Sequence, residues 1–389
     1  MKWMCLGICL MIFGPVTDKT GADEGPTSAQ GLKSPLQPKW ESLLPPEDLS
    51  GWKILGGSAR YRVEDSVVIG QSTPNSPNTW LITERQFGDF ELEYEFLCDP
   101  SLNSGVQIRS EAVGSGARGF QVEIDVDDQR KRFWSAGLYE EGDRGWIDDL
   151  KDNPAARAAH KPHDWNHVRV VAVGAHLQTW INGVAAAEVF DTRRLSGFIG
   201  LQVHGVGNRQ DPLEIRWRGL RVRDLGAHRW TSLPLQSDQS GPESIMLPKD
   251  CSTFRIDLSS EADAPTVSIL WRGRVHLDFS TDSLDYSYQG EVTEDAAENP
   301  KSGPMGGGKD HFRGRFQVFS GDEERSCLVL SDGQRRLFLA APGPPPGGQI
   351  VLSGRRSRIR TLEALVPAES TQKPQPKGTE DVAPKTSDQ

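Results

Sequence analysis

Alternation of polar and apolar residues in three separate segments is the feature that most constrains how this chain folds. In residues 198–204 an apolar set alternates with a polar set that ends in Gln202 and His204. Residues two apart on a β-strand share a face, so the apolar set points to a core and the polar set away from it. This segment therefore predicts a strand whose outer face carries a glutamine and a histidine side by side.

Two earlier segments repeat the pattern. Residues 102–109 and 119–125 would place on their outer faces Gln107, Arg109, Gln121, Glu123 and Asp125. If the three strands are neighbours in one sheet, these side chains form one patch with a guanidinium, two carboxylates and an imidazole. Polar residues are also ordinary on the solvated face of a sheet. The patch holds no lysine, however, and glycines bracket its strands, which favours a ligand site.

Composition and turn signals predict an all-β fold. Glycine accounts for 40 and proline for 26 of the 389 residues, and helical periodicity is scarce. From Trp40 to Gly226 short strand-like segments alternate with turn signals, among them Asn182–Gly183, a two-residue hairpin signal. Residues 153–159 give the one convincing helix, with a capping asparagine followed by proline. Regular strand spacing of this kind indicates a sandwich or jelly roll.

The sequence divides into two β-domains joined and flanked by polar segments. We expect a signal peptide, a first linker, a jelly roll, a second linker, a degenerate second β-sandwich and a disordered tail at residues 1–22, 23–38, 39–226, 227–248, 249–367 and 368–389. The second domain echoes strand motifs of the first in shortened form. It offers no histidine in place of His204, so we expect it to lack the first domain's chemistry.

The first residues predict export. A basic start and a short apolar run are typical of a signal peptide, and the run is too short for a permanent membrane helix. We therefore expect a protein of the periplasm, the cell surface or the medium, with no integral membrane segment after cleavage.

The net charge of −10 and the mixing of arginine with acidic residues argue against nucleic acid as a partner. Cys98 is expected as a buried free thiol, and a pairing of Cys251 with Cys327 stays open.

Three aromatic residues follow the alternating segment at residues 119–125. Trp134, Tyr139 and Trp146 lie in a glycine-broken stretch, where loops set on a rigid sandwich commonly carry sites. Aromatic rings can stack on the apolar faces of sugars. Packing in the core is the alternative for any one of these rings.

Six motifs in sequence order resemble the 3-keto-disaccharide hydrolase family. They are Asn103–Arg109, Gly119–Asp125, Ala136–Tyr139, Asp164–Asn166, Trp180–Gly183 and Gly197–Gly205. The resemblance covers residues 40–225 and does not extend to residues 227–389. It implies a concanavalin-like jelly roll, export, and action on sugars whose C3 hydroxyl has been oxidised to a ketone.

The resemblance also implies a chemistry that suits the polar patch. A ketone at C3 acidifies the hydrogen on C2, so a base can remove it, an enediolate forms and the group on C1 leaves. His204, or Glu123 with a pKa raised by Asp125, is the expected base, and Arg109 the expected electrophile. Sugar hydroxyls and ring faces would be held by Gln107, Asp125, Gln202, Tyr139, Trp146 and Trp134.

Two alternatives stay open at this point. The carboxylates could instead hold a divalent metal that polarises the ketone. The domain could also be a non-catalytic, lectin-like module that binds a glycan or a protein. Direct hydrolysis by paired carboxylates is less attractive, because Glu123 and Asp125 lie on one predicted strand and cannot flank a bond from opposite faces.

Overall fold

The computed structural model describes the first domain almost completely and the strands of the second. Described are residues 38–44, 48–127, 131–235, 243–248, 251, 253–258, 267–271, 275–279, 284–288, 315–320, 327–331, 336–340, 348–354 and 359–368. The predicted signal peptide and most of the predicted tail lie outside these residues. In the described part of the chain, no helix is long and apolar enough to cross a membrane.

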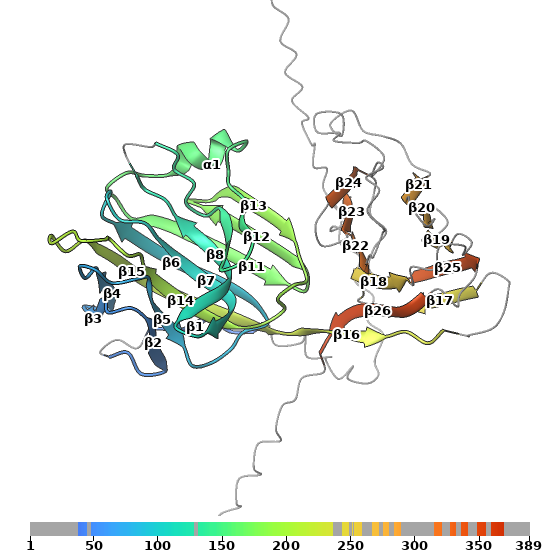
Figure 1. Ribbon diagram of the computed structural model, residues 1–389, viewed down its shortest axis with the longest axis horizontal. Helices are drawn as coiled ribbons and strands as arrows, with labels where there is room; N and C mark the ends of the chain where they lie inside the picture. Colours follow the sequence, from blue (N-terminus) through green and yellow to red (C-terminus); the bar gives the residue numbers. More distant parts are fainter. Residues whose placement is uncertain are drawn as a thin grey trace, which may run out of the picture. The chain divides into compact units, whose positions relative to one another are not determined.

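The first domain is a sandwich of two antiparallel sheets (Figure 1). The eight-stranded sheet has the order β13 (Val184–Phe190), β12 (His176–Ile181), β11 (Asn166–Val173), β6 (Asp89–Cys98), β15 (Glu214–Gly226), β4 (Val67–Gln71) and β3 (Arg60–Glu64), with β1 (Glu41–Ser42) paired to β15. The seven-stranded sheet has the order β10 (Gly145–Asp148), β9 (Leu138–Glu141), β8 (Gly116–Ile124), β7 (Ser104–Val113), β14 (Phe198–Val203), β5 (Thr79–Thr83) and β2 (Trp52–Gly56).

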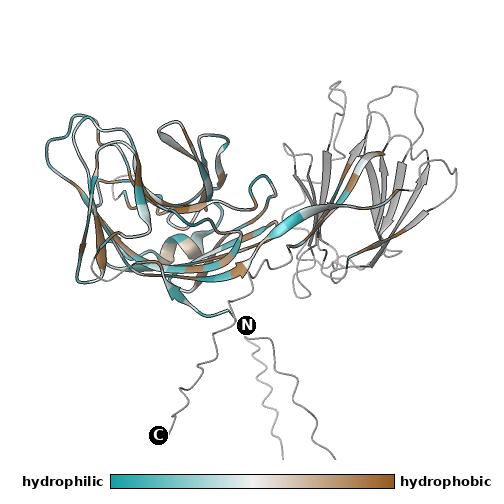
Figure 2. Cartoon of the chain, turned by 90° about the horizontal axis from the view of Figure 1, so that it is seen from below, coloured by the Kyte–Doolittle hydropathy of each residue, from teal (hydrophilic) through white to brown (hydrophobic). Residues whose placement is uncertain are grey.

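The core of this sandwich lies between the two sheets. Leu92 and Phe96 of β6 face it from one sheet, and Val106 of β7, Val122 of β8 and Leu201 of β14 face it from the other; all five are fully buried or nearly so. Hydrophobic and hydrophilic stretches both occur along the strands of this domain (Figure 2). Because β8, β7 and β14 are direct neighbours, the predicted joining of the three alternating segments is confirmed.

Two local predictions are confirmed as well. Helix α1 (Pro154–Ala159) begins after Asn153, whose side chain accepts a hydrogen bond from the Ala156 N–H, and proline occupies the first turn. Asn182 and Gly183 connect β12 to β13, and their positive φ angles of 49° and 83° are those that a tight hairpin turn of this kind requires. Cys98 is a free, buried thiol, as expected, and Cys251 is also free and buried.

A β-bulge in β7 overturns the predicted place of Arg109. Ile108 pairs with Phe120 and Glu111 with Arg118, so Arg109 and Ser110 together oppose the single residue Gly119. The extra residue shifts the alternation, and Arg109 turns away from the outer face while Ser110 takes its place there. Regular alternation, on which the prediction rested, ends one residue before Arg109.

The second domain also consists of two antiparallel sheets. One has the order β16 (His228–Ser232), β26 (Ile359–Pro367), β18 (Thr253–Leu258), β22 (Arg315–Ser320), β23 (Cys327–Ser331) and β24 (Arg336–Ala340); the other has the order β17 (Glu243–Leu247), β25 (Gly348–Gly354), β19 (Val267–Trp271), β20 (Val275–Phe279) and β21 (Leu284–Tyr288). The prediction of a linker at residues 227–248 is wrong in part, because β16 and β17 come from it and pair with β26 and β25. The polar composition of residues 227–248 did not indicate that they contribute two edge strands.

Candidate functional site

Two adjoining hollows lie on and beside the outer face of the seven-stranded sheet, the face turned away from the core. The first, which we call the sheet hollow, has a volume of about 330 Å³ and is lined by Asn78, Asn103, Gln121, Glu123, Arg132, Tyr139, Glu141, Trp146, Gln202 and His204. The second, the end hollow, has a similar volume of about 330 Å³. Its lining is Pro100, Ser101, Leu102, Asn103, Asp125, Val126, Asp127, Arg132, His204, Gly205, Val206, Arg209 and Leu213.

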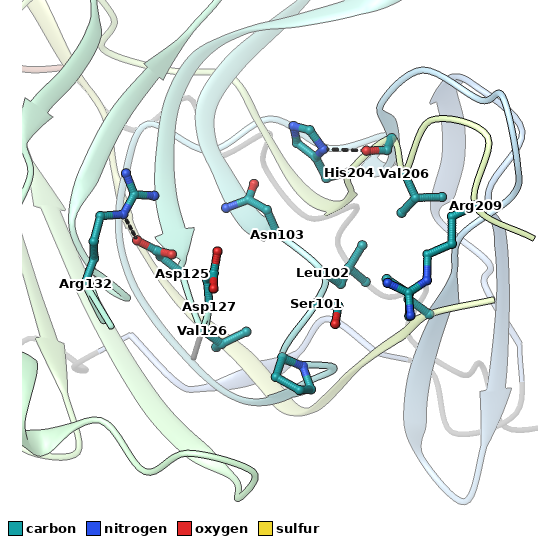
Figure 3. Close-up of a pocket in the computed structure, with 13 residues that line it drawn as sticks. Ser101, Leu102, Asn103, Asp125, Val126, Asp127, Arg132, His204, Val206 and Arg209 are labelled. Atoms are coloured by element: carbon teal, nitrogen blue, oxygen red, sulfur yellow. Dashed lines mark hydrogen bonds and ion pairs between the residues drawn. The ribbon is translucent and has the colours of Figure 1, made fainter. Parts of the chain in front are cut away.

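The two hollows form one groove because they share three residues. Asn103, Arg132 and His204 belong to both linings. Strand register explains why these side chains meet. β7 begins at Ser104, which pairs with the last residues of β8 and β14, so the loops that carry Asn103 and His204 leave the sheet at the same end of these strands. Figure 3 shows Asn103, Arg132, Asp125 and His204 around the end hollow.

The floor of the sheet hollow is built from two rows of paired residues. In one row Gln202 of β14 pairs with Gly105 of β7, which pairs with Glu123 of β8. Gly105 has a physical role in this row, since a Cβ atom there would lie 2.5 Å from Cγ of Gln121. The missing side chain leaves room for Gln121 to lie across the sheet between Gln202 and Glu123.

The second row continues from amides to aromatic rings. Gln107 pairs with Gln121, Gln121 with Tyr139, and Tyr139 with Trp146. The rings of Tyr139 and Trp146 meet edge to face, with centroids 5.5 Å apart. This row gives the hollow an aromatic wall beside its carboxylate, an arrangement suited to a flat, hydroxylated ligand.

Glu123 is the central acid of the groove. Its side chain is buried, and its Oε1 accepts a hydrogen bond of 2.5 Å from Gln121 Nε2 while its Oε2 accepts one of 3.3 Å from Asn103 Nδ2. Burial raises the pKa of Glu123 to about 7, and the charges of Asp125 and Glu141 add to the rise, whereas the two amide donors oppose it. A carboxyl group with this pKa can both take and release a proton near neutrality.

Gln121 is oriented by further amide and hydroxyl groups beneath it. Gln107 donates from Nε2 to Gln121 Oε1 over 2.6 Å, and Ser110 Oγ donates to Gln107 Oε1 over 2.7 Å. Gln121 Nε2 also lies 3.3 Å from Oε1 of Gln202. Both ends of the Gln107 amide are thus occupied inside the protein, and its side chain is fully buried. The prediction that Gln107 holds sugar hydroxyls is therefore wrong.

A cation and a second carboxylate stand where the hollows join. Arg132 Nε lies 3.0 Å from Asp125 Oδ2, an ion pair drawn in Figure 3. The guanidinium of Arg132 also stacks over the ring of Trp134, 4.6 Å from its centroid, and Trp134 in turn contacts Trp146 edge to face. Trp134 thus supports Arg132 and Trp146 but, unlike these two residues and Asp125, it is not part of the lining of either hollow.

His204 and Glu141 complete the titratable groups of the groove. His204 is exposed, and its Nδ1 lies 2.8 Å from the carbonyl oxygen of Gly205. Burial raises the pKa of Glu141, and the nearby imidazole of His204 opposes that rise. Burial and the charges of Glu141 and Glu123 also raise the pKa of Tyr139.

Arg109, the predicted electrophile, lies elsewhere. It is 0% exposed and binds groups of the opposite sheet: Nε donates to Gly88 O over 2.7 Å, Nη1 to Gly174 O over 2.7 Å, and Nη2 to Asp89 Oδ1 over 3.0 Å. Its guanidinium thus ties the two sheets together, and burial lowers its pKa to about 10. The structure brings Glu123, Asp125, Gln202, Tyr139, Trp146 and His204 together, and leaves Arg109 out.

Several groove residues were missed at the sequence level. Arg132, Asn103, Asn78, Glu141 and Arg209 line the groove although the alternation pattern did not single them out. Arg132, Asn103, Asn78 and Arg209 come from loops, where no periodicity marks the direction of a side chain. Glu141 is on the four-residue strand β9, which is too short to show alternation.

The carboxylates do not fit the alternative of a metal site. Among the described residues, no three His, Cys, Asp or Glu side chains gather as ligands. Both oxygens of Glu123 face amide donors, and Asp125 faces a guanidinium, so these groups already have partners of the kind a cation would replace. We derive no step through a metal.

Fold and groove together define a class: a jelly-roll sandwich with a polar, aromatic-walled groove on one sheet. Residues 39–223 match the family model described as the 3-keto-alpha-glucoside-1,2-lyase-like domain. The resemblance seen in the motifs is thereby confirmed for residues 39–223. No curated protein matches the chain.

Solved structures resemble about half of the chain at low identity. A Bacillus subtilis protein of unknown function with a galectin-like fold is 12% identical, with 48% of this chain and 94% of that one covered and a TM-score of 0.36. The carbohydrate binding module CBM66 from Bacillus subtilis is 10% identical (46% and 98% covered, TM-score 0.32). A glycosyl hydrolase family protein from Mycobacterium fortuitum is 10% identical (47% and 98% covered, TM-score 0.30). At these values the similarities assign no activity to this chain.

Proposed function

We propose that the first domain cleaves the glycosidic bond of 3-keto-glycosides. The observation that carries this proposal is the buried Glu123 at the floor of a groove whose wall is aromatic and whose rim holds Arg132 and His204. The match of residues 39–223 to the family model of the 3-keto-alpha-glucoside-1,2-lyase-like domain supports the same substrate class. We further propose, from the basic and apolar first residues, that the protein is exported.

The proposed reaction begins with proton removal from C2. Glu123 takes the C2 proton, and the electron pair of that C–H bond forms an enediolate with the C3 ketone. As the enediolate collapses, the C1–O bond breaks, and the leaving oxygen takes a proton. The products are a 1,2-unsaturated 3-keto sugar and the free alcohol; addition of water across C1 and C2 then gives net hydrolysis.

Each role is given to a group with suitable chemistry in the groove. A base with a pKa of about 7 is ionised in a large fraction of molecules at neutral pH, which suits Glu123. The guanidinium of Arg132 takes the role of stabilising the enediolate oxygen, which the sequence had assigned to Arg109. His204, exposed at the junction of the hollows, donates the proton to the leaving oxygen. Tyr139 and Trp146 bind the ring face of the sugar.

The test is turnover of nitrophenyl 3-keto-glucoside carrying deuterium at C2, by the wild type and by Glu123→Gln. Removal of the base should lower kcat/KM by about 10²–10⁴-fold, and the wild type should release the label and show a primary isotope effect. Glu95→Gln, on the opposite outer face, is the matched control and should turn over normally. The same assay in a chelator tests the metal alternative.

A lectin-like module is the competing outcome. Amide side chains and aromatic rings in one groove also suit the binding of an unmodified glycan. If neither the wild type nor any variant releases nitrophenol, but the wild type binds unoxidised glucosides and Trp146→Ala does not, the groove is a binding site and the catalytic proposal is wrong.

A further inference from the structure

Glu123 is the end of a chain of three side-chain hydrogen bonds. Ser110 Oγ donates to Gln107, Gln107 donates to Gln121, and Gln121 donates to Glu123, over 2.7, 2.6 and 2.5 Å. All four side chains are buried. Because these buried side chains do not contact water, no water molecule competes for their hydrogen bonds, and the series of hydrogen bonds keeps its geometry.

The direction of this chain is fixed at its carboxylate end, because the hydroxyl of Ser110 at the other end can donate or accept. An ionised carboxylate only accepts hydrogen bonds, so Gln121 must turn its NH₂ group to Glu123 and its oxygen to Gln107. Gln107 must then donate to that oxygen and turn its own oxygen to Ser110. The single hydroxyl hydrogen of Ser110 has Gln107 Oε1 as its nearest acceptor at 2.7 Å, with the carbonyl oxygens of Ile108 at 2.9 Å and Phe120 at 3.3 Å. Reversal of either amide would place two acceptors or two donors against each other.

The bulge in β7 and two glycines make room for the far end of the chain. The bulge places Ser110, rather than Arg109, on the outer face next to Gln107. A Cβ atom at Gly119 would lie 2.3 Å from Ser110 Oγ, and one at Gly197 would lie 2.3 Å from the Ser110 nitrogen. Gly119 of β8 on one side of Ser110 and Gly197, directly before β14, on the other are therefore the one residue type that leaves space for it.

We propose that Ser110, Gln107 and Gln121 are positioning residues that orient the carboxylate of Glu123 and stabilise its ionised form. The inference rests on the proposed function, in which Glu123 is the base. It also assigns the reacting atom: Oε1 is held by Gln121 at 2.5 Å, whereas among the described residues the donor to Oε2 is Asn103 at 3.3 Å, so Oε2 takes the proton.

The chain should counteract the effect of burial on Glu123. Burial raises the pKa of Glu123, and the hydrogen bonds from Gln121 and Asn103 oppose that rise. A variant in which Gln121 no longer donates to Glu123 should therefore have a still higher pKa at this carboxyl group. Without Gln107, the amide of Gln121 is free to reverse and to present its oxygen to the carboxylate. In Gln107→Leu we expect the pKa of Glu123 to rise by about one unit, and in Ser110→Ala by less.

The direct experiment titrates Glu123 in the full chain by carboxyl carbon NMR, with its signal assigned from Glu123→Gln. Ser104→Ala is the matched control, because Ser104 is a buried serine of the same strand whose hydroxyl donates to the Gln202 carbonyl oxygen over 2.6 Å, outside the chain. It should leave the titration unchanged. If Ser110→Ala and Gln107→Leu fold and Glu123 titrates at the wild-type pH, the proposal is wrong; if Gln107→Leu fails to fold, Ser110→Ala alone decides it.

The titration needs no turnover, so this inference and the proposed function can fail separately. Where turnover is observed, the acidic limb of the kcat/KM profile should move to higher pH by the same amount as the titration, with the plateau nearly unchanged. If the variants instead lower the plateau of kcat/KM and leave the acidic limb at the wild-type pH, Ser110 and Gln107 have only a structural role.

Discussion

The two outer faces of the first domain are both polar, but they differ in how their charges are compensated. On the eight-stranded sheet, arginines of β15 pair with glutamates of β6 in a ladder: Arg218 with Glu95, Arg221 with Glu93 and Arg223 with Glu91. On the seven-stranded sheet, the partners of Glu123 among the described residues are two amide donors, Gln121 and Asn103. Arg218 holds the pKa of Glu95 below its usual range, whereas burial raises that of Glu123 to about 7.

This difference separates a solvated face from a candidate site. Exposed ion pairs contribute little and leave no group in an unfavourable state. A buried carboxyl group without a cation is unfavourable to folding, and such groups cluster at functional sites. Polar residues alone did not distinguish the two faces, since alternation with charged residues occurs on both. The faces differ in how deeply their carboxylates are buried and in whether an arginine pairs with them.

The largest expected effect concerns the one arginine of β7 that belongs to neither face. Arg109→Met should lower the free energy of unfolding by about 3–5 kcal/mol, because Asp89 and two backbone carbonyls lose their buried donor. Urea unfolding followed by tryptophan fluorescence measures this. A variant that keeps wild-type stability but loses turnover would restore Arg109 to the catalytic role that its sequence position predicted.

The second prediction uses the raised pKa of Glu123. A carboxyl group whose pKa rises on folding from 4.5 to about 7 binds its proton more tightly in the folded state, so the free energy of unfolding falls as pH rises through this range. The loss is on the order of 3 kcal/mol above pH 7. Glu123→Gln should lack this fall and be more stable than the wild type at pH 8, but not at pH 4. Parallel pH dependences of the two proteins would contradict the buried acid.

Alternation predicted the sheet that carries the site, because a period of two survives as long as the strand is regular. It placed Glu123, Gln202 and His204 on one face, and these three residues line the sheet hollow. It failed one residue beyond Ile108, where the bulge exchanges the positions of Arg109 and Ser110. No residue type in this segment marks the bulge, which becomes visible only in the pairing with β8.

Burial was the second quantity that the sequence did not contain. Gln107 shares a face with Gln121, as predicted, yet it lies under the groove rather than in it. The missing side chain of Gly105 leaves room for Gln121, whose oxygen accepts a hydrogen bond from Gln107. Arg132 reaches the groove from a loop, where no periodicity orients a side chain, so the cation of the site could not be read from strand patterns.

The third prediction compares aromatic residues of the two faces. Trp146→Ala should raise KM for a 3-keto-glucoside by about tenfold with a small change in kcat, because the ring contributes to binding rather than to proton transfer. Trp180→Ala is the control: Trp180 stacks under Arg169 on the eight-stranded sheet and should leave both constants unchanged. Equal effects of the two substitutions would mean that the aromatic wall of the groove does not contact the sugar.

The smallest effect should have the opposite sign to that of Glu123. A hydrogen bond from Arg218 lowers the pKa of Glu95, so this pair stabilises the protein above the ordinary pKa of a glutamate and loses its contribution as pH falls through the lowered value. Glu95→Gln should therefore be less stable than the wild type at pH 7, by less than about 1 kcal/mol because the pair is partly exposed, and equal to it near pH 2. Thermal unfolding at several pH values and at low and high salt measures this. One substitution, glutamate to glutamine, would then stabilise one outer face and destabilise the other at neutral pH, as expected if compensation of charge separates the site from the ladder; the same sign at both positions would remove that distinction.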